Sequence, residues 1–442
     1  MERSQCFREF AKYSSLNVLG MIGLSCYILA DTYFISKGLG ANGLAALNLA
    51  IPVYSCIHGS GLMLGMGGAT NYSIQKGQKS SQSTNQLFVN TLYLGGLFAA
   101  LFVLAGLFLS ETITALLGAD AEIFAMTNTY LKVILLFSPA FLCNDIILCF
   151  VRNDGNPRLS MIAMLAGSLS NIVLDYIFIF PFDMGIFGAV LATGFAPLIG
   201  LSILSGHWRK KRSQLFFQKS RPKFSLVPKI LSLGFPSFLA EVSSGIVMIV
   251  FNFIILGLQG NIGVAAYGII ANLSLVVIAI YTGIAQGVQP LISRAYGRQE
   301  KTTVKRVLRY AVLTVLLLSG LLYLLVFLFA DPVARIFNSR NDALLQAIAA
   351  KGLKLYFLCA AFAGFNIVAS TFFSSVEKAL PAHILSLLRG LILLIPLAFL
   401  LSSLAGITGV WLSVPAAEGL TAMVGCVFFY LPHSSARHTW KT

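Results

Sequence analysis

The chain alternates long apolar runs with short polar stretches, and each run is about 20 residues or longer, enough for a helix to cross the roughly 30 Å hydrocarbon core of a bilayer. The runs follow one another with only brief loops between them. We count twelve, at 13–35, 43–72, 86–110, 124–150, 159–181, 184–206, 234–258, 262–292, 307–330, 343–373, 380–403 and 405–431. The pattern therefore predicts an all-α membrane protein with twelve transmembrane helices.

Composition agrees with this prediction. Of the 442 residues, 57% are hydrophobic and 11% are charged, a balance that argues against a soluble enzyme of this size. The net charge of +15 raises the question of nucleic-acid binding, but most of the 31 lysines and arginines fall in loops on one side of the predicted membrane. Only Lys37, Arg335 and Arg340 fall in loops on the other side. This asymmetry follows the positive-inside rule, so we expect a multi-pass cell-membrane protein with both termini cytoplasmic, a lipid bilayer as its surroundings and no nucleic-acid partner.

The two halves of the chain repeat each other. The longest basic polar segment, 207–224, separates six spans from six. A shift of 220 residues superimposes seven identical positions, Gly40, Gly43, Ala45, Ala46, Gly67, Ser73 and Gly77 on Gly260, Gly263, Ala265, Ala266, Gly287, Ser293 and Gly297. Because each half has an even number of spans, both halves enter the membrane from the same side, which predicts two parallel six-helix repeats. The predicted units are an amino-terminal lobe at 1–206, a cytoplasmic linker at 207–233, a carboxy-terminal lobe at 234–431 and a tail at 432–442.

Four polar residues in the first half form the principal candidate site. Asn171 and Asp175 are four residues apart and share one helix face, Thr193 lies in the next span, and Asp31 lies at a similar depth in the first span. A carboxylate within the membrane is costly, so it indicates function. Burial disfavours its charged form and prepares it to exchange protons, whereas the same oxygens are also suitable ligands for Na⁺. The sequence leaves both cations open.

Glu241, Gln286 and Gln289 form a second, weaker candidate in the other half. Glu241 lies in the seventh span among small residues, and the two glutamines lie in the eighth. We predict that these side chains line a central cavity or, for the glutamines, cross-link helices.

The remaining polar residues within spans have structural interpretations. We predict an ion pair or an interfacial position for Asp145, with Arg152 as its partner, and a pair between Arg389 and Glu418. His58 is interpreted as a hydrogen-bonded contact between helices.

Sequence motifs for catalysis are missing. The chain has no P-loop, no serine elbow and no metal-spaced His or Cys cluster, and its seven cysteines are scattered through the spans. We therefore expect no enzyme activity, no cofactor and no metal site. Without an ATP site, secondary transport is the function that remains.

Several segments resemble the multidrug and toxic compound extrusion (MATE) family, and the likeness covers nearly the whole chain. They are ADTYFIS in the first span, VRNDGNP, NIVLD, MGIFGAVLAT, GFPSFLAEV and GVQPLISRAYG. The resemblance implies a V-shaped pair of six-helix lobes that exports cationic or amphiphilic compounds in exchange for H⁺ or Na⁺. It places the amino-terminal cation site at Asp31, Asn171, Asp175 and Thr193. Glu241 matches an acid of a carboxy-terminal sodium site, but the tenth span carries no acid between 344 and 373 to complement it.

Two related functions are alternatives. A flippase for lipid-linked saccharides would be expected to line its cavity with several arginines, whereas Arg389 is the one arginine that the predicted spans place inside the membrane. A dedicated metabolite exporter has the same sequence features as a drug exporter. For the exporter we expect a monomer with a small organic substrate that is cationic or amphiphilic.

Overall fold

A computed structural model describes residues 3–78, 81–209, 213–217, 221–338 and 342–430, and within these ranges every regular element is a helix. The first half comprises α1 Arg3–Gly77, α2 Ser81–Phe108, α3 Ser110–Leu116, α4 Phe124–Leu136, α5 Ser138–Asn153, α6 Pro157–Ile179, α7 Gly185–Leu204 and η1 Ser205–His207. The second half comprises η2 Phe224–Leu226, α8 Val227–Gly297, α9 Lys301–Phe337, α10 Ala343–Tyr356, η3 Phe357–Cys359, α11 Ala360–Ser375, α12 Ala379–Leu387, η4 Leu388–Ile392 and α13 Leu394–Tyr430.

Three of these helical stretches each contain two spans. By length and composition, eight described stretches can cross a membrane, or nine when α4 and α5, bent by 48° at their junction, are counted as one span. The stretches that contain α1, α8 and α13 turn sharply at Gly40, Gly260 and Gly406, where φ is 68°, 59° and 57°. Glycine adopts positive φ without the steric cost that a Cβ adds. Each of the three turns divides one stretch into two spans, so the nine stretches contain the predicted twelve spans.

The same glycines confirm the predicted repeat. Gly40 and Gly260, which the 220-residue shift aligns, share nearly the same backbone angles, with ψ of −156° and −153°. Gly185 and Gly406, which begin the matching segments GIFGAVLAT and GITGVWLSV, have φ of 60° and 57°. Corresponding positions therefore carry the same turn in both halves.

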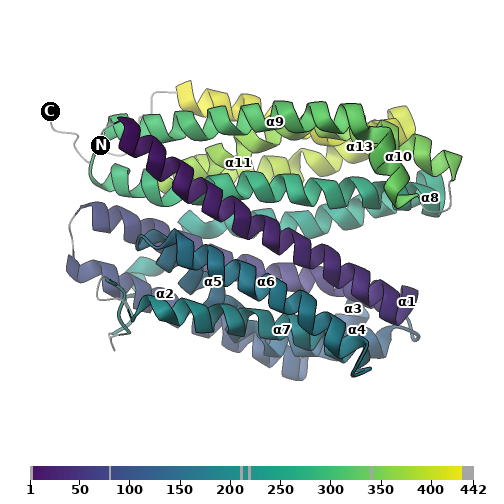
Figure 1. Ribbon diagram of the computed structural model, residues 1–442, viewed down its shortest axis with the longest axis horizontal. Coiled ribbons are helices and arrows are strands. Elements are labelled where there is room, and N and C mark those ends of the chain that lie inside the picture. The colour runs from purple at the N-terminus through teal and green to yellow at the C-terminus, as the bar shows by residue number, and fades with distance from the viewer. Residues whose placement is uncertain (1–2, 79–80, 210–212, 218–220, 339–341, 431–442) are drawn as a thin grey trace.

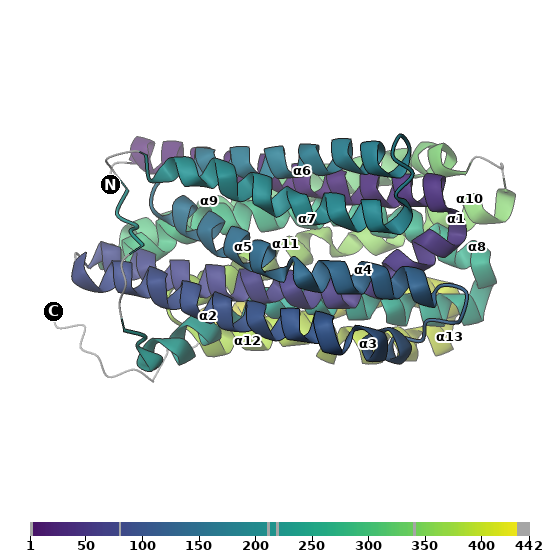
Figure 2. The ribbon, with the colours of Figure 1, turned by 90° about the horizontal axis from the view of Figure 1, so that it is seen from below.

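The helices form two lobes that lie side by side (Figure 1). The amino-terminal lobe contains α1 to α7, and the carboxy-terminal lobe contains α8 to α13. The first arm of α1 runs diagonally between them, and its Cys6, Phe10 and Tyr13 join the carboxy-terminal core. We call the end where α1 begins the linker end, and the opposite end, where α1 and α8 turn back, the hairpin end (Figure 2). The predicted domain limits stay a prediction, and the tail at 432–442 lies outside the described residues.

The outer surface suits a lipid environment. Helix α9 exposes Leu317, Leu321, Leu324 and Leu328, whose side chains are 52% to 74% accessible. A continuous apolar face of this kind is unfavourable in water and favourable in a bilayer.

The lobes meet closely at the linker end, through contacts that repeat about the pseudo-two-fold axis. A Cβ added to Gly77 would lie 2.5 Å from the carbonyl oxygen of Arg294, and a Cβ added to Gly297 would lie 2.1 Å from that of Ile74. The 220-residue shift relates both pairs. Only glycine allows backbones to approach this closely, so these residues hold α1 against α8 where the lobes close.

The linker is attached to the amino-terminal lobe through Asp154, which follows α5. Its carboxylate accepts hydrogen bonds from the Tyr72 hydroxyl at 2.7 Å and the Gln214 backbone N–H at 3.1 Å, lies 2.9 Å from His207 Nε2, and pairs with Lys76. Burial by itself would raise the pKa of Asp154, but the His207 hydrogen bond and the Lys76 charge outweigh it and lower the pKa to about 2. The linker is therefore anchored to one lobe by an ionised carboxylate.

Candidate functional site

The four residues of the principal candidate site come from three helices of the amino-terminal lobe. Asp31 lies on the first arm of α1, Asn171 and Asp175 on α6, and Thr193 on α7. All four are buried, with at most 7% of each residue accessible. The structure thus brings together side chains that are up to 162 positions apart in the sequence.

Helix α6 places its two site residues side by side because of the residue at which the helix begins and because of the helical repeat. Pro157 begins the helix, and the Asn156 side chain accepts a hydrogen bond from the Leu159 backbone N–H at 3.3 Å. From this fixed start, the four-residue spacing places Asn171 and Asp175 one above the other on the face that meets α7.

A chain of polar contacts joins the site. With its amide oriented to satisfy both neighbours, Asn171 donates to Asp175 Oδ2 at 3.1 Å and accepts from the Thr193 backbone N–H at 3.1 Å. The Thr193 hydroxyl donates to the Ala189 carbonyl at 3.2 Å. On the other side, the carboxyl groups of Asp31 and Asp175 are within hydrogen-bonding contact.

The carboxyl pair has the chemistry needed to take up a proton or a small cation. Two carboxylates in contact repel each other when both are ionised, so they share a proton or hold a cation between them. One oxygen of each group, Asp31 Oδ1 and Asp175 Oδ1, is buried and has no hydrogen-bond partner. Unpartnered buried oxygens of this kind are costly unless a ligand satisfies them.

Two tyrosines that the sequence analysis did not single out also surround the site. Tyr130 on α4 is 3% accessible and lies close to the Thr193 side chain. Tyr27 lies one helical turn before Asp31, and its hydroxyl is 3.0 Å from that of Tyr54. The sequence alone places Tyr27 one helical turn before Asp31, whereas the proximity of Tyr130 to Thr193 depends on how α4 packs against α7.

The predicted ion pair between Asp145 and Arg152 is wrong. Asp145 Oδ2 instead lies 2.9 Å from Nδ1 of His58, whose ring stacks on Tyr54. Seven residues separate Asp145 from Arg152, which corresponds to two helical turns or roughly 10 Å along α5. The interpretation of His58 as a hydrogen-bonded contact between helices agrees with the structure.

Arg152 instead joins the two lobes at the linker end. Its fully buried guanidinium donates to the side-chain oxygens of Asn17 and Gln286, each at 2.8 Å, and to the sulfur of Met66 at 3.1 Å. The neighbouring Asn153 donates to Gln289 Oε1 at 3.0 Å. Gln286 and Gln289 therefore connect the carboxy-terminal lobe to the end of α5, and both also line the cavity described next.

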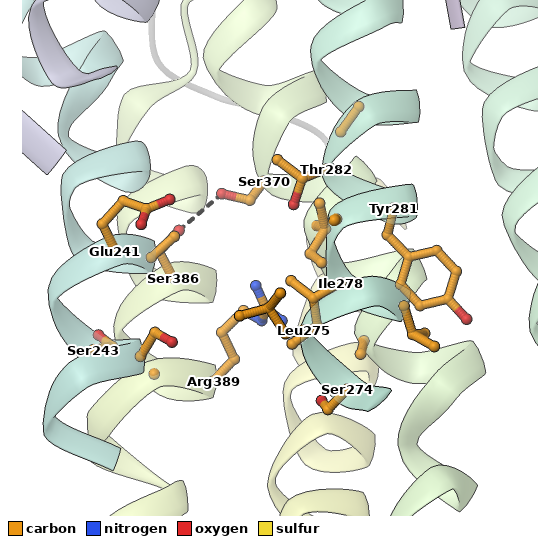
Figure 3. Close-up of a pocket in the computed structure, with 18 of the residues that line it drawn as sticks. Glu241, Ser243, Ser274, Leu275, Ile278, Tyr281, Thr282, Ser370, Ser386 and Arg389 are labelled. Carbon is orange, nitrogen blue, oxygen red and sulfur yellow. Dashed lines mark hydrogen bonds between the residues drawn. The ribbon is translucent and has the colours of Figure 1, made fainter. Parts of the chain in front are cut away.

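A cavity of about 350 Å³, part of which Figure 3 shows, is lined mostly by the carboxy-terminal lobe, and α1 contributes residues such as Ser25, Leu62 and Met66 to its wall. Glu241 lies in its wall, as do Arg389 and Glu418. The predicted pair of Arg389 with Glu418 is present, at 2.8 Å between Nη2 and Oε1. No group of three or more potential metal ligands occurs among the described residues.

Glu241 lacks a neighbouring acid on α10 or α11, as the sequence indicates. The cavity's other acid, Glu418, is held by Arg389 and by the Asn366 amide, which donates to its Oε2 at 2.7 Å. An oxygen cage for Na⁺ is therefore less complete around Glu241 than around Asp31 and Asp175.

Comparisons with known proteins agree with this architecture. The MatE family model matches residues 18–177 and 236–400. The multidrug export protein MepA of Staphylococcus saprophyticus is 28% identical over 432 residues, which covers 97% of this chain and 95% of that protein, and MepA of Staphylococcus aureus strain MRSA252 gives the same values.

Solved structures show the same fold. An outward-facing multidrug resistance MATE transporter of the MOP superfamily superposes with a TM-score of 0.89 at 24% identity, covering 95% of this chain and 94% of that one. A mutant of the Vibrio cholerae MATE transporter VcmN superposes with a TM-score of 0.88 at 22% identity, covering 96% of each chain. Because the family model matches most of the sequence, the chain belongs to the MatE family and is a bacterial MATE transporter.

Proposed function

We propose that this transporter exports cationic or amphiphilic organic compounds in exchange for H⁺ or Na⁺ bound by Asp31, Asn171, Asp175 and Thr193. The observation that carries the proposal is the buried contact between Asp31 and Asp175, in which each acid keeps an unpartnered oxygen. The multidrug export proteins that match over 97% of the chain support the choice of substrate.

The closure of the two lobes at one end is compatible with an exchange cycle. Glycine contacts and the Arg152 hydrogen bonds close the linker end, and the positive-inside rule places that end in the cytoplasm. The closed linker end supports assigning an outward-facing state to the proposed transporter, which we take to be a monomer in the cell membrane with both termini cytoplasmic.

Binding of the cation shifts the equilibrium toward the state that releases the compound. A proton or Na⁺ at the carboxyl pair removes its excess negative charge and changes how the first arm of α1 packs against α6. The compound held between the lobes is released when the cation-bound state binds it less tightly, because each ligand shifts the equilibrium only through its differential affinity.

The test is ethidium transport in proteoliposomes, with a pH gradient and a Na⁺ gradient imposed separately. We expect one gradient to drive transport in the wild type and neither to drive it in Asp175→Asn. Asp331→Asn is the matched control, because that carboxyl group is 60% accessible at the end of α9. Undiminished transport by Asp175→Asn would remove the site assignment. Absence of gradient-driven transport of ethidium and other small cations by folded wild-type protein would favour a flippase or a dedicated metabolite exporter.

The charge of the cavity favours the cation exporter over the flippase. Among the described residues that line it, the charged side chains are Glu241, Glu418 and Arg389, and Arg389 is paired with Glu418. Arg152, the other buried arginine described above, is taken up by hydrogen bonds at the linker end.

A further inference from the structure

The carboxy-terminal lobe carries an apolar groove that is separate from the cavity described above, and we call it the outer groove. It has a volume of about 380 Å³. Helix α11 packs against both α9 and α13 in this lobe, and all three helices contribute to the groove (Figure 1). The lining residues are Leu316 on α9, Ala361, Phe362 and Phe365 on α11, and Gly419, Ala422, Met423 and Cys426 on α13.

The outer groove faces the bilayer and suits a hydrocarbon chain. Phe362 and Met423 are 43% and 59% accessible, and Leu316 lies next to Leu317 on the part of α9 that exposes leucines to lipid. Every described residue that lines the groove is apolar. An acyl chain is flexible and can fill an irregular groove of this kind, whereas a polar ligand would find no hydrogen-bonding side chain there.

Two exposed cations lie on the same face of α9 as the groove, toward the linker end. Lys305 and Arg309 are four residues apart, and Arg309 precedes Leu316 by seven residues. These spacings correspond to about one and two helical turns, so the three side chains share one face, and Arg309 lies roughly 10 Å nearer the linker end than Leu316 does. The same order of charge and hydrocarbon is found in a phospholipid, whose acyl chains extend from its phosphate into the membrane core.

The two cations lack partners among the described side chains. Neither Lys305 nor Arg309 forms an ion pair or a hydrogen bond with another described residue, whereas Arg298 at the same end lies 3.8 Å from Glu300. The positive-inside rule explains why cations occur at this end of the protein. It does not require them to lie on the one face of α9 that leads into an apolar groove.

We propose that the outer groove and the pair Lys305 and Arg309 bind a phospholipid with an anionic headgroup from the cytoplasmic leaflet. The phosphate lies at the two cations, where the Arg309 guanidinium can donate two parallel hydrogen bonds to phosphate oxygens, and one acyl chain lies in the groove. The lipid thereby connects α9, α11 and α13. This inference goes beyond the proposed export function and does not depend on the coupling ion or on the exported compound.

The charges favour a lipid over a second copy of the chain as the occupant of the groove. Two copies in one membrane have the same orientation, and a symmetric dimer uses the same surface patch on both. Pairing through the outer groove would therefore bring Lys305 and Arg309 of both copies together at the same depth, where like charges repel. A phospholipid with an anionic headgroup instead neutralises them.

The test compares two photoreactive lipids, a phosphatidylglycerol and a phosphatidylcholine, that carry the same diazirine-bearing acyl chain. Each is added at trace level to phosphatidylcholine proteoliposomes that contain the full chain, and mass spectrometry measures the labelling of peptides that line the outer groove. The charge variant is Lys305→Gln, Arg309→Gln. Its matched control is Lys37→Gln, Arg335→Gln, which removes two exposed cations at the hairpin end.

A third variant, Gly419→Leu, fills the groove without changing charge. A Cβ at Gly419 would lie 3.8 Å from the Phe362 ring, an ordinary contact, so the larger side chain can extend into the groove. We expect wild type and the hairpin-end control to be labelled about 30-fold more by the phosphatidylglycerol, because each cation near the headgroups contributes about fivefold. The charge variant should label about equally with both lipids, and Gly419→Leu should lose groove labelling by both.

Three outcomes would overturn the inference. The first is equal labelling of wild type by the two lipids, and the second is a charge variant that keeps the preference for phosphatidylglycerol. The third is absence of groove labelling in wild-type protein that forms a dimer, which would assign the groove to a second copy. The charge variant changes only exposed side chains, so it decides the question if Gly419→Leu does not fold. Each of these outcomes leaves the proposed export function standing, because none involves transport.

Discussion

The lobes close at the linker end because Gly77 and Gly297 have no Cβ, and Gly297→Ala tests this directly. The new Cβ would lie 2.1 Å from the Ile74 carbonyl oxygen, whereas real contacts of this kind are essentially never under 3.0 Å. The α1 and α8 backbones must therefore separate by about 1 Å. Overpacking of this kind costs about 1–3 kcal/mol. The linker-closed state should lose about 5- to 150-fold in population relative to a state in which this end is open.

Electron paramagnetic resonance distances between spin labels measure this shift. Labels at Arg158 on α6 and Thr302 on α9, both exposed at the linker end, report the separation of the lobes in a variant without the native cysteines. We expect Gly297→Ala to broaden the distribution toward longer distances. Gly77→Ala should do the same, because its Cβ would lie 2.5 Å from the Arg294 carbonyl oxygen across the same pseudo-symmetric contact.

The matched control is Gly320→Ala on α9, where a Cβ would meet nothing within 4 Å. It makes the same chemical change within a helix and should leave the distances unchanged. An unchanged distribution for Gly297→Ala, in protein as stable as wild type, would refute the reasoning that these glycines allow the lobes to close.

Three further changes should alter stability in detergent. The pKa of Asp154 is lowered to about 2 from an ordinary 3.8, which corresponds to about 2 kcal/mol of stabilisation at 1.36 kcal/mol per pKa unit. This stabilisation is present above pH 4 and is lost as the pH falls toward 2. Thermal unfolding at pH 7 should therefore show Asp154→Asn to be less stable than wild type, and equal melting temperatures would contradict this prediction. Gly40→Ala places a Cβ at φ 68° and should cost about 1–2 kcal/mol, which denaturant unfolding against Gly320→Ala as control would detect. His58→Ala removes the hydrogen-bond partner of buried Asp145 and should cost about 1–3 kcal/mol, whereas His58→Gln can still donate and should recover part of the loss; equal effects of the two would argue against the hydrogen bond.

The site shows where prediction from the sequence ends. Asn171 and Asp175 share a face because of helical periodicity alone, so their proximity was predictable. That Asp31 contacts Asp175 was only suggested by their similar depth, because contact depends on the crossing of α1 over α6. Tyr130 was missed for the same reason. The roles of these residues stay predictions until transport is measured.

The sequence by itself determined the spans, the parallel repeat and the turns, because each follows from local properties: apolar length, residue spacing and the freedom of glycine at positive φ. Gly40 and Gly260 show this, since two sites 220 residues apart adopt the same backbone angles. The tertiary structure decided which polar partners meet. Asp145 pairs with His58 rather than with Arg152, because a buried charge takes the hydrogen-bonding group that packing brings within 3 Å, and sequence separation does not specify that distance.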